Sequence, residues 1–95
     1  MTAGNASPIS DGAHAVVLAS GDHLTSRGLS PIAEIISWAN DETERADFAI
    51  SPLISIRKAL MLANLQVCDI DLWEINEAFS AVVLANCKLL DIELD

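Results

Sequence analysis

The segment Asp69–Phe79, together with the run Ser80–Leu90 behind it, constrains the fold more than any other part of the chain. Polar and apolar residues alternate just ahead of Asn76, and this predicts a short strand over Asp69–Ile75. The apolar run that follows predicts a helix over Glu77–Leu90. Asn76 is therefore expected at a strand-to-helix junction, the place where α/β proteins hold polar groups at the carboxyl end of a sheet.

Asn76 also has a simpler structural interpretation. An asparagine at a helix start can cap the first turn by accepting a backbone hydrogen bond on its side-chain oxygen. Glu77 in the first turn would suit the positive end of the helix dipole. The local pattern alone leaves both interpretations open, a plain helix cap and a functional amide.

Two similar units are expected ahead of this junction. Ala13–Ser20 is a run of small and apolar residues that predicts a buried strand. Asp22–Arg27 predicts one or two helical turns, ended by Gly28. Pro31–Ala39 predicts the second strand.

The second main helix has clear start and stop signals. Ser51 is predicted as its N-cap, Pro52 as its first residue and Asn64 as its end. The charged loop Asn40–Ala46 before it is expected to face solvent. The resulting order is β-α-β-α-β-α with short connections. This order predicts an α/β fold with a mostly parallel sheet and right-handed crossovers.

The third helix is unusual because it is apolar on nearly every side. Lys88 is its only charged side chain between Ala78 and Leu90. A helix of this kind is buried on all sides or meets a partner. We therefore expect the isolated chain to expose this helix, and to aggregate or require a partner.

Composition excludes some classes of function. The 95 residues suffice for one small domain, and the net charge is −9. Nucleic acid is not an expected partner, because phosphate binding needs clustered Lys and Arg. A membrane is not an expected partner either, since no apolar run reaches the roughly 18 residues that a span requires.

The cysteines and histidines do not form a motif. Cys68 and Cys87 are nineteen positions apart and are expected to be reduced, mostly buried thiols. His14 and His23 lie on different segments, so a zinc site has no support. Residues 1–22 lack the basic start and continuous apolar run of a signal peptide.

Three segments of the chain resemble one known family, the thiolases. Trp73–Ser80 with Val82–Asn86 resembles their Asn-Glu-Ala-Phe segment, closest to the short-chain, acetoacetyl-CoA type. Thr2–Ser7, followed by Ser10–Ala13, resembles the loop that opens the C-terminal half of a thiolase. Asp47–Pro52 with Ile56–Leu60 resembles the segment between the two. Order and spacing agree with the family over nearly the whole chain.

The resemblance implies a fold and a division of the chain. Residues 1–95 would be part of a thiolase C-terminal half, with residues 1–12 as a coenzyme A and potassium loop and residues 13–95 as three βα units. The third helix would lie between the sheets of two similar halves. Met1 would stand within a longer protein, and a homo-oligomer would be the expected assembly.

The resemblance also implies an activity, acetyl-CoA C-acetyltransferase. This enzyme converts acetoacetyl-CoA and coenzyme A reversibly to two acetyl-CoA. Asn76 matches the asparagine that positions a water in an oxyanion hole, and Ser7 matches the residue whose hydroxyl contacts the pantetheine arm. Backbone carbonyls of Ala3, Gly4 and Ala6 match those that hold potassium in the mitochondrial type. No other cofactor is expected.

The remaining catalytic groups of the family have no match in the chain. The nucleophilic Cys would belong to the N-terminal half, while the Gly-His-Pro histidine and the second catalytic Cys would follow Asp95. Cys68 and Cys87 match neither position, so the isolated chain is expected to be inactive.

Several alternatives remain open. The chain could be a short, non-catalytic interaction module that pairs with a full-length thiolase, or part of a 3-ketoacyl-CoA thiolase. Bulk properties alone would also allow a generic small α/β domain. A mitochondrial location is expected first and a cytoplasmic one second.

Overall fold

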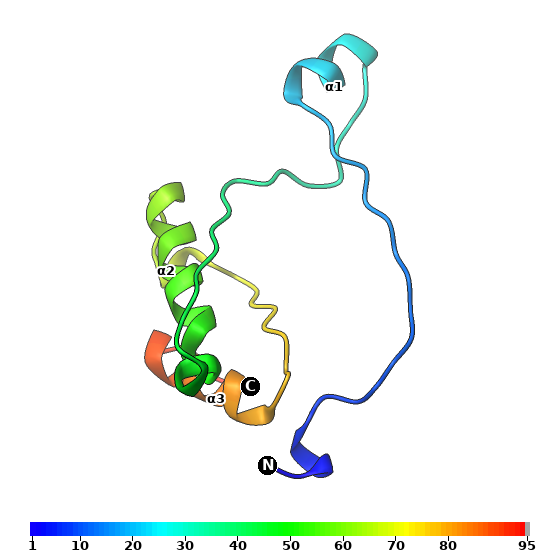
Figure 1. Ribbon diagram of the computed structural model, residues 1–95. Helices are drawn as coiled ribbons and strands as arrows, with labels where there is room; N and C mark the ends of the chain where they lie inside the picture. The colour runs from blue at the N-terminus through cyan, green and yellow to red at the C-terminus, as the bar shows by residue number, and fades with distance from the viewer. Residues whose placement is uncertain (95) are drawn as a thin grey trace.

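The computed structural model describes residues 1–94 and shows three α-helices joined by long irregular segments (Figure 1). The α-helices are α1 (Gly21–Arg27), α2 (Ser51–Ala63) and α3 (Ser80–Leu90). Short 3₁₀-helices occur at η1 (Ala3–Asn5), η2 (Arg45–Ile50) and η3 (Val67–Asp69). Within the described residues, no helix is both long and apolar enough to cross a membrane.

Helix α1 begins and ends as its sequence predicts. The Ser20 hydroxyl accepts a hydrogen bond from the backbone N–H of His23, which satisfies one of the free donors of the first turn. Gly28 follows the last turn with φ +61°, a left-handed conformation that glycine adopts without steric cost. The predicted helix over Asp22–Arg27 is therefore confirmed, with one more residue at its start.

Helix α2 has the predicted end but a different start. Asn64 takes the left-handed conformation (φ 56°), and its N–H and that of Leu65 both reach the Leu60 carbonyl. Ser51, expected as the N-cap, is instead the first helical residue. The reason is that η2 runs directly into α2, so Ser51 already has helical dihedral angles and Ile50 precedes the helix.

Helix α3 begins three residues later than predicted, at Ser80 rather than Glu77. Phe79 is held in an extended conformation (φ −146°, ψ 148°) by an antiparallel bridge with Ala6, and an extended residue cannot be part of a helix. Asn76 therefore does not cap the helix, and this part of the prediction was wrong. The helix ends at Leu90, as predicted.

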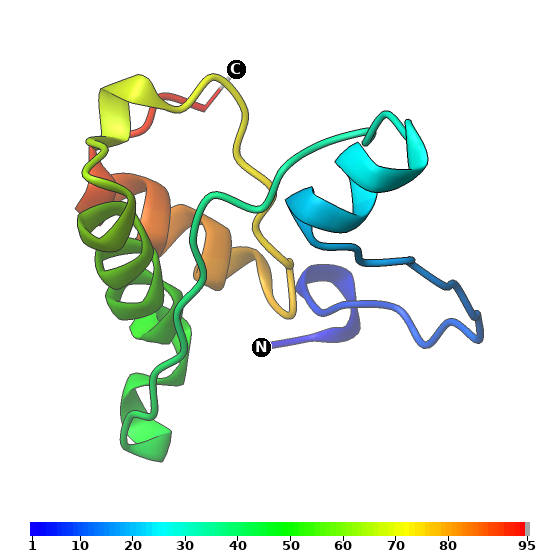
Figure 2. The same cartoon turned by 90° about the horizontal axis from the view of Figure 1, so that it is seen from above.

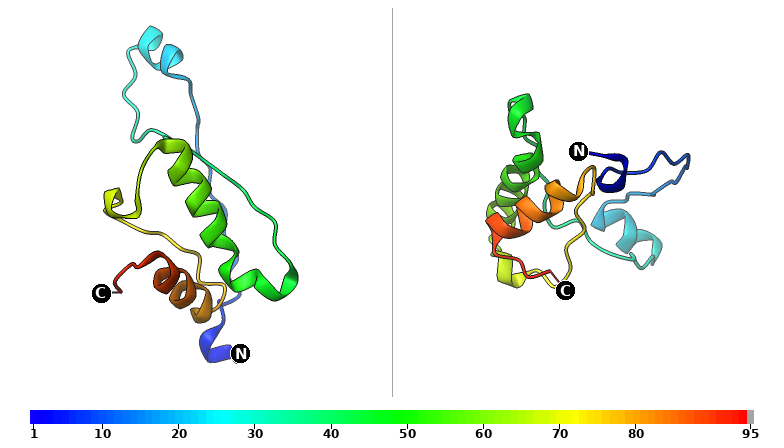
Figure 3. Two further views of the ribbon diagram at one scale, coloured as in Figure 1. Left: turned by 90° about the vertical axis from the view of Figure 1, so that its left-hand side faces the viewer. Right: turned by 90° about the horizontal axis from the view of Figure 1, so that it is seen from below.

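The small core lies where α2, α3 and η2 meet (Figures 1 and 3). Its buried apolar side chains are Leu53, Val82, Cys87 and Leu90. Asn86 is the one buried polar residue among those described. Cys87 is buried as expected, whereas Cys68 is exposed; both are free thiols. The rest of the chain forms a wide loop that carries α1 away from this core (Figures 1 and 2).

The predicted parallel sheet does not form within residues 1–94. The segments 13–20 and 31–39 have no regular secondary structure, and the third predicted strand begins as η3 and continues as an irregular segment. Val17, expected inside a buried strand, is 94% exposed. A strand requires a neighbour for its backbone N–H and C=O groups. In the described part of the chain, the bridge between Ala6 and Phe79 is the only such pairing.

Candidate functional site

The two segments that carry the predicted site residues meet in space, although they lie at opposite ends of the sequence. Ala6 and Phe79 form an antiparallel bridge, and the backbone N–H of Ser7 donates to the Ala78 carbonyl at 3.0 Å. This contact fixes the start of the loop 1–12 against the turn that precedes α3. Ser7 and Asn76 are therefore held by one local assembly.

Asn76 lies in a tight turn just before that bridge. Its backbone carbonyl accepts a hydrogen bond from the N–H of Ala78 at 3.0 Å, two residues on. The Asn76 side chain is exposed. An exposed amide next to a fixed backbone can hold a water molecule or a substrate oxygen.

A hollow of about 380 Å³ lies beside Asn76. Asn76 and Glu74 supply polar groups to its wall, while Phe48, Ile56 and Val82 supply apolar ones. Ser51, Pro52, Ser55, Ile75 and Ala78 complete the lining. A mostly apolar wall with a few polar groups is typical of sites that bind small organic molecules.

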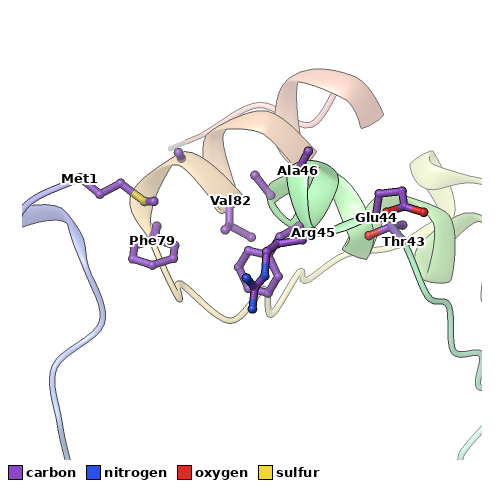
Figure 4. A pocket seen from close by; sticks show the side chains of 10 residues that line it. Met1, Thr43, Glu44, Arg45, Ala46, Phe79 and Val82 are labelled. Carbon is purple, nitrogen blue, oxygen red and sulfur yellow. The ribbon is translucent and has the colours of Figure 1, made fainter.

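A larger hollow of about 610 Å³ shares Phe48 and Val82 with the smaller one and is also lined by Phe79 (Figure 4). Figure 4 shows Phe79 and Val82 facing Arg45 and Ala46 of η2, with Met1 at one edge. Neither Asn76 nor Ser7 lines it. We assign the candidate site to the smaller hollow, because Asn76 lines only that one; Ser7 lines neither hollow.

The predicted cation ligands lie in the turn η1 and directly after it. The Asn5 side chain closes this turn by accepting a hydrogen bond from the Thr2 N–H at 2.7 Å. Ala3 and Gly4 lie in the turn, and Ala6 is extended where it pairs with Phe79. Their carbonyl oxygens suit a hard cation chemically, but three oxygens are fewer than such a cation usually binds. They fit a partial ligand set that other groups would complete.

Asn86 lines neither hollow, but it is a buried polar residue close to the candidate site that the sequence pattern did not single out. Its side-chain Nδ2 donates to the Ala49 carbonyl of η2 at 2.8 Å and to the Val82 carbonyl at 2.7 Å. Beside this contact, the rings of Phe48 and Phe79 pack edge to face, with their centroids 6.4 Å apart. The one available signal was an uncharged polar residue in the middle of a mostly apolar helix.

Most charged residues near α2 face solvent, as predicted, but the Asp41 side chain is only 11% exposed. Two of the basic residues have partners. Lys58 forms an ion pair with Asp41 of the charged loop. Arg57 donates a hydrogen bond to the Leu89 carbonyl of α3 at 3.3 Å. Exposed pairs of this kind contribute about 0–1 kcal/mol. They orient the loop on α2 and do not form a binding site.

The site contains no thiol nucleophile among the described residues. Cys68 lies in η3 and Cys87 is buried in α3, and neither lines either hollow. No group of three or more His, Cys, Asp or Glu residues gathers as a metal site within residues 1–94. The arrangement can bind and orient a ligand, but it offers no thiolate for attack.

Comparison with known proteins points to one family. The family model described as "Thiolase, C-terminal domain" matches residues 29–95. An acetyl-CoA acetyltransferase of Yarrowia lipolytica is 53% identical over 98% of this chain, and the mitochondrial acetyl-CoA acetyltransferase of Danio rerio is 45% identical over all of it. A cytosolic acetyl-CoA acetyltransferase of Gibberella zeae is 47% identical over the whole chain.

A solved structure gives the same result for the backbone. The crystal structure of human mitochondrial 3-ketoacyl-CoA thiolase matches 98% of this chain with a TM-score of 0.91 and 39% identity. The match covers 24% of that protein, and the chain spans about a quarter of the length of the curated relatives, covering 23% of the Yarrowia lipolytica and Danio rerio proteins. The irregular segments therefore follow the backbone path of a thiolase even where no sheet forms.

Proposed function

Because this chain belongs to the thiolase family, we propose that it supplies part of the active site of an acetyl-CoA C-acetyltransferase. The proposed reaction converts acetoacetyl-CoA and coenzyme A to two acetyl-CoA, and it is reversible. The observation that carries the proposal is the bridge between Ala6 and Phe79, because it brings together the loop with Ser7 and the turn with Asn76. The high similarity to acetyl-CoA acetyltransferases supports this substrate over longer acyl chains.

Asn76 has the central role in this proposal. Cleavage of the substrate carbon–carbon bond places negative charge on a thioester oxygen, and donors already oriented toward that oxygen stabilise the transition state. The exposed Asn76 amide, beside the smaller hollow, would hold the water that donates to this oxygen. The Ser7 hydroxyl would contact the pantetheine arm of coenzyme A.

The nucleophile must come from outside residues 1–95. Acyl transfer of this type requires a thiolate to accept the acetyl group. Cys87 is buried and Cys68 lies away from both hollows, so neither can serve. We therefore expect the isolated 95-residue chain to show no thiolysis, and the complete enzyme to use the rest of the polypeptide and to assemble as a homo-oligomer.

The test is the substitution Asn76→Ala in the complete enzyme. We expect kcat for acetoacetyl-CoA thiolysis to fall about 10²–10³-fold, the usual effect of losing one oxyanion donor. The melting temperature should change little, since the side chain is exposed. Asn40→Ala removes another exposed asparagine and is the matched control. Equal kcat values for the two variants would contradict the role of Asn76.

A second candidate function is a non-catalytic module that pairs with a full-length thiolase. The observation that favours it is the exposed face of α3, where Leu84 and Leu89 are 55% and 47% exposed. This module would need no nucleophile. Thiolysis by a complete enzyme that contains these 95 residues distinguishes the first function from the second.

Two finer features belong to the same proposal. A potassium ion could be held partly by the carbonyls of Ala3, Gly4 and Ala6, where it would add positive charge next to the coenzyme A loop. No other cofactor is proposed. We propose a mitochondrial location, as named for the Danio rerio relative, with the cytoplasm as the alternative, since the Gibberella zeae relative is named cytosolic.

A further inference from the structure

Asn86 is the most deeply buried side chain in the described structure, with 0% exposure. Its two N–H donors both bind carbonyl oxygens, so the orientation of the amide is fixed by its surroundings. The Val82 contact holds the side chain against its own helix, and the Ala49 contact crosses to η2. Asn86 thus links two elements that are 37 residues apart.

The Asn86 side chain is only partly satisfied by hydrogen bonds. The Oδ1 atom of Asn86 is buried and accepts no hydrogen bond from any residue in the described part of the chain. An unpaired buried acceptor lowers stability, and an apolar side chain of similar size would avoid that penalty. The amide therefore contributes orientation more than stability.

The element that Asn86 holds lies next to the candidate site. Ala49 receives the hydrogen bond, and its neighbour Phe48 packs edge to face against Phe79. Phe79 lies three residues after Asn76 and is paired with Ala6. Phe48 and Asn76 line the same hollow. One continuous set of contacts therefore runs from the Asn86 amide through η2 to the turn that carries Asn76.

We propose that Asn86 is a positioning residue that sets the placement of Asn76 through η2 and the Phe48–Phe79 pair. This inference rests on the proposed function of Asn76. Without the hydrogen bond to Ala49, η2 can shift on α3, and Phe48 no longer fixes the turn before the helix. A displacement of about 1 Å at a catalytic group can lower the rate about 10²-fold.

The test compares two variants of the complete enzyme that affect the same helix. Asn86→Leu keeps the size of the side chain and removes both donors, while Leu90→Ala creates a cavity at the far end of α3 from Asn76. Asn86→Ala is made in parallel, in case leucine does not fit. Melting temperature, kcat and KM for acetoacetyl-CoA are measured for each, together with hydrogen exchange of the peptide that contains residues 76–79.

We expect the Asn86 variants to lower kcat about 10- to 100-fold while KM changes less than about threefold. Leu90→Ala should lower the melting temperature at least as much as the Asn86 variants do, but its kcat should equal that of the unmodified enzyme. If Leu90→Ala lowers kcat equally, Asn86 acts only through stability and the inference is overturned.

Hydrogen exchange separates this inference from the proposed function. If the unmodified enzyme shows no thiolysis, the proposed function fails, but the effect of Asn86 on the placement of residues 76–79 can still be measured. Faster exchange of residues 76–79 in the Asn86 variants than in Leu90→Ala would support the link. Equal exchange in all variants would overturn it.

Discussion

Ser7 combines two separate roles in its backbone and its side chain. Its N–H is engaged by the Ala78 carbonyl, whereas its exposed hydroxyl is free to reach a ligand. Removing the hydroxyl therefore leaves the bridge intact. The loss of a single neutral hydrogen bond corresponds to about 0.5–1.5 kcal/mol of binding free energy.

For Ser7→Ala in the complete enzyme, we expect KM for coenzyme A to rise about three- to tenfold with kcat nearly unchanged. Steady-state kinetics with coenzyme A as the varied substrate measure this effect. Ser10→Ala, a nearby exposed serine in the same loop, is the control. A fall in kcat with KM unchanged would place the hydroxyl at the reaction itself and contradict a contact with the pantetheine arm.

At the scale of elements, the sequence predicted helix ends well and strand pairing poorly. Gly28 and Asn64 end α1 and α2 through local backbone geometry, which depends on the residue itself. The start of α3 depends on Ala6, which is far from it in sequence, and no local pattern reveals that contact. The position of Asn76 near the start of α3 was predictable from the strand-to-helix pattern, and the family role of the residue came from the resemblance.

The absence of a sheet from residues 1–94 also reflects contacts between residues that are far apart in the sequence. Segments 13–20 and 31–39 carry the apolar composition of strands, yet a strand forms only where a neighbour supplies hydrogen bonds. Composition indicates which segments can form strands, but it does not indicate which other segments lie beside them to pair with. The contact from Asn86 to Ala49 escaped prediction because it is equally non-local.

The end of α2 provides a direct test at this scale. Asn64 has φ 56°, and its N–H and that of Leu65 close the last turn on Leu60. Asn64→Ala should destabilise this end by about 1 kcal/mol, because alanine tolerates the left-handed conformation poorly, while Asn64→Gly should have little effect or a small stabilising one.

Hydrogen exchange of a peptide that covers residues 60–66 measures the difference. Exchange should be faster in Asn64→Ala and unchanged or slower in Asn64→Gly. Leu62→Ala, at an exposed position inside the helix, is the control for a change of side chain alone. Faster exchange in the glycine variant than in the alanine variant would show that the left-handed turn does not form.

At the scale of the whole molecule, the described chain is too open to be a compact domain. Its radius of gyration is 16.6 Å, whereas a compact domain of this length has a radius of about 12 Å. The core consists of a few side chains between α2, α3 and η2. Many large apolar residues are exposed, among them Val16, Val17, Ile32, Trp38 and Leu84. Apolar surface on this scale is a site of association.

We therefore expect the isolated 95-residue chain to self-associate or to bind a partner. Sedimentation at increasing protein concentration should show species heavier than 10.1 kDa, and a thermal scan should give a broad or irreversible transition. The double substitution Leu84→Lys and Leu89→Lys changes only exposed positions of α3 and should reduce association without loss of helix content. A monomer with a sharp, reversible transition at high concentration would show that the chain stabilises itself, and its exposed face would then need another explanation.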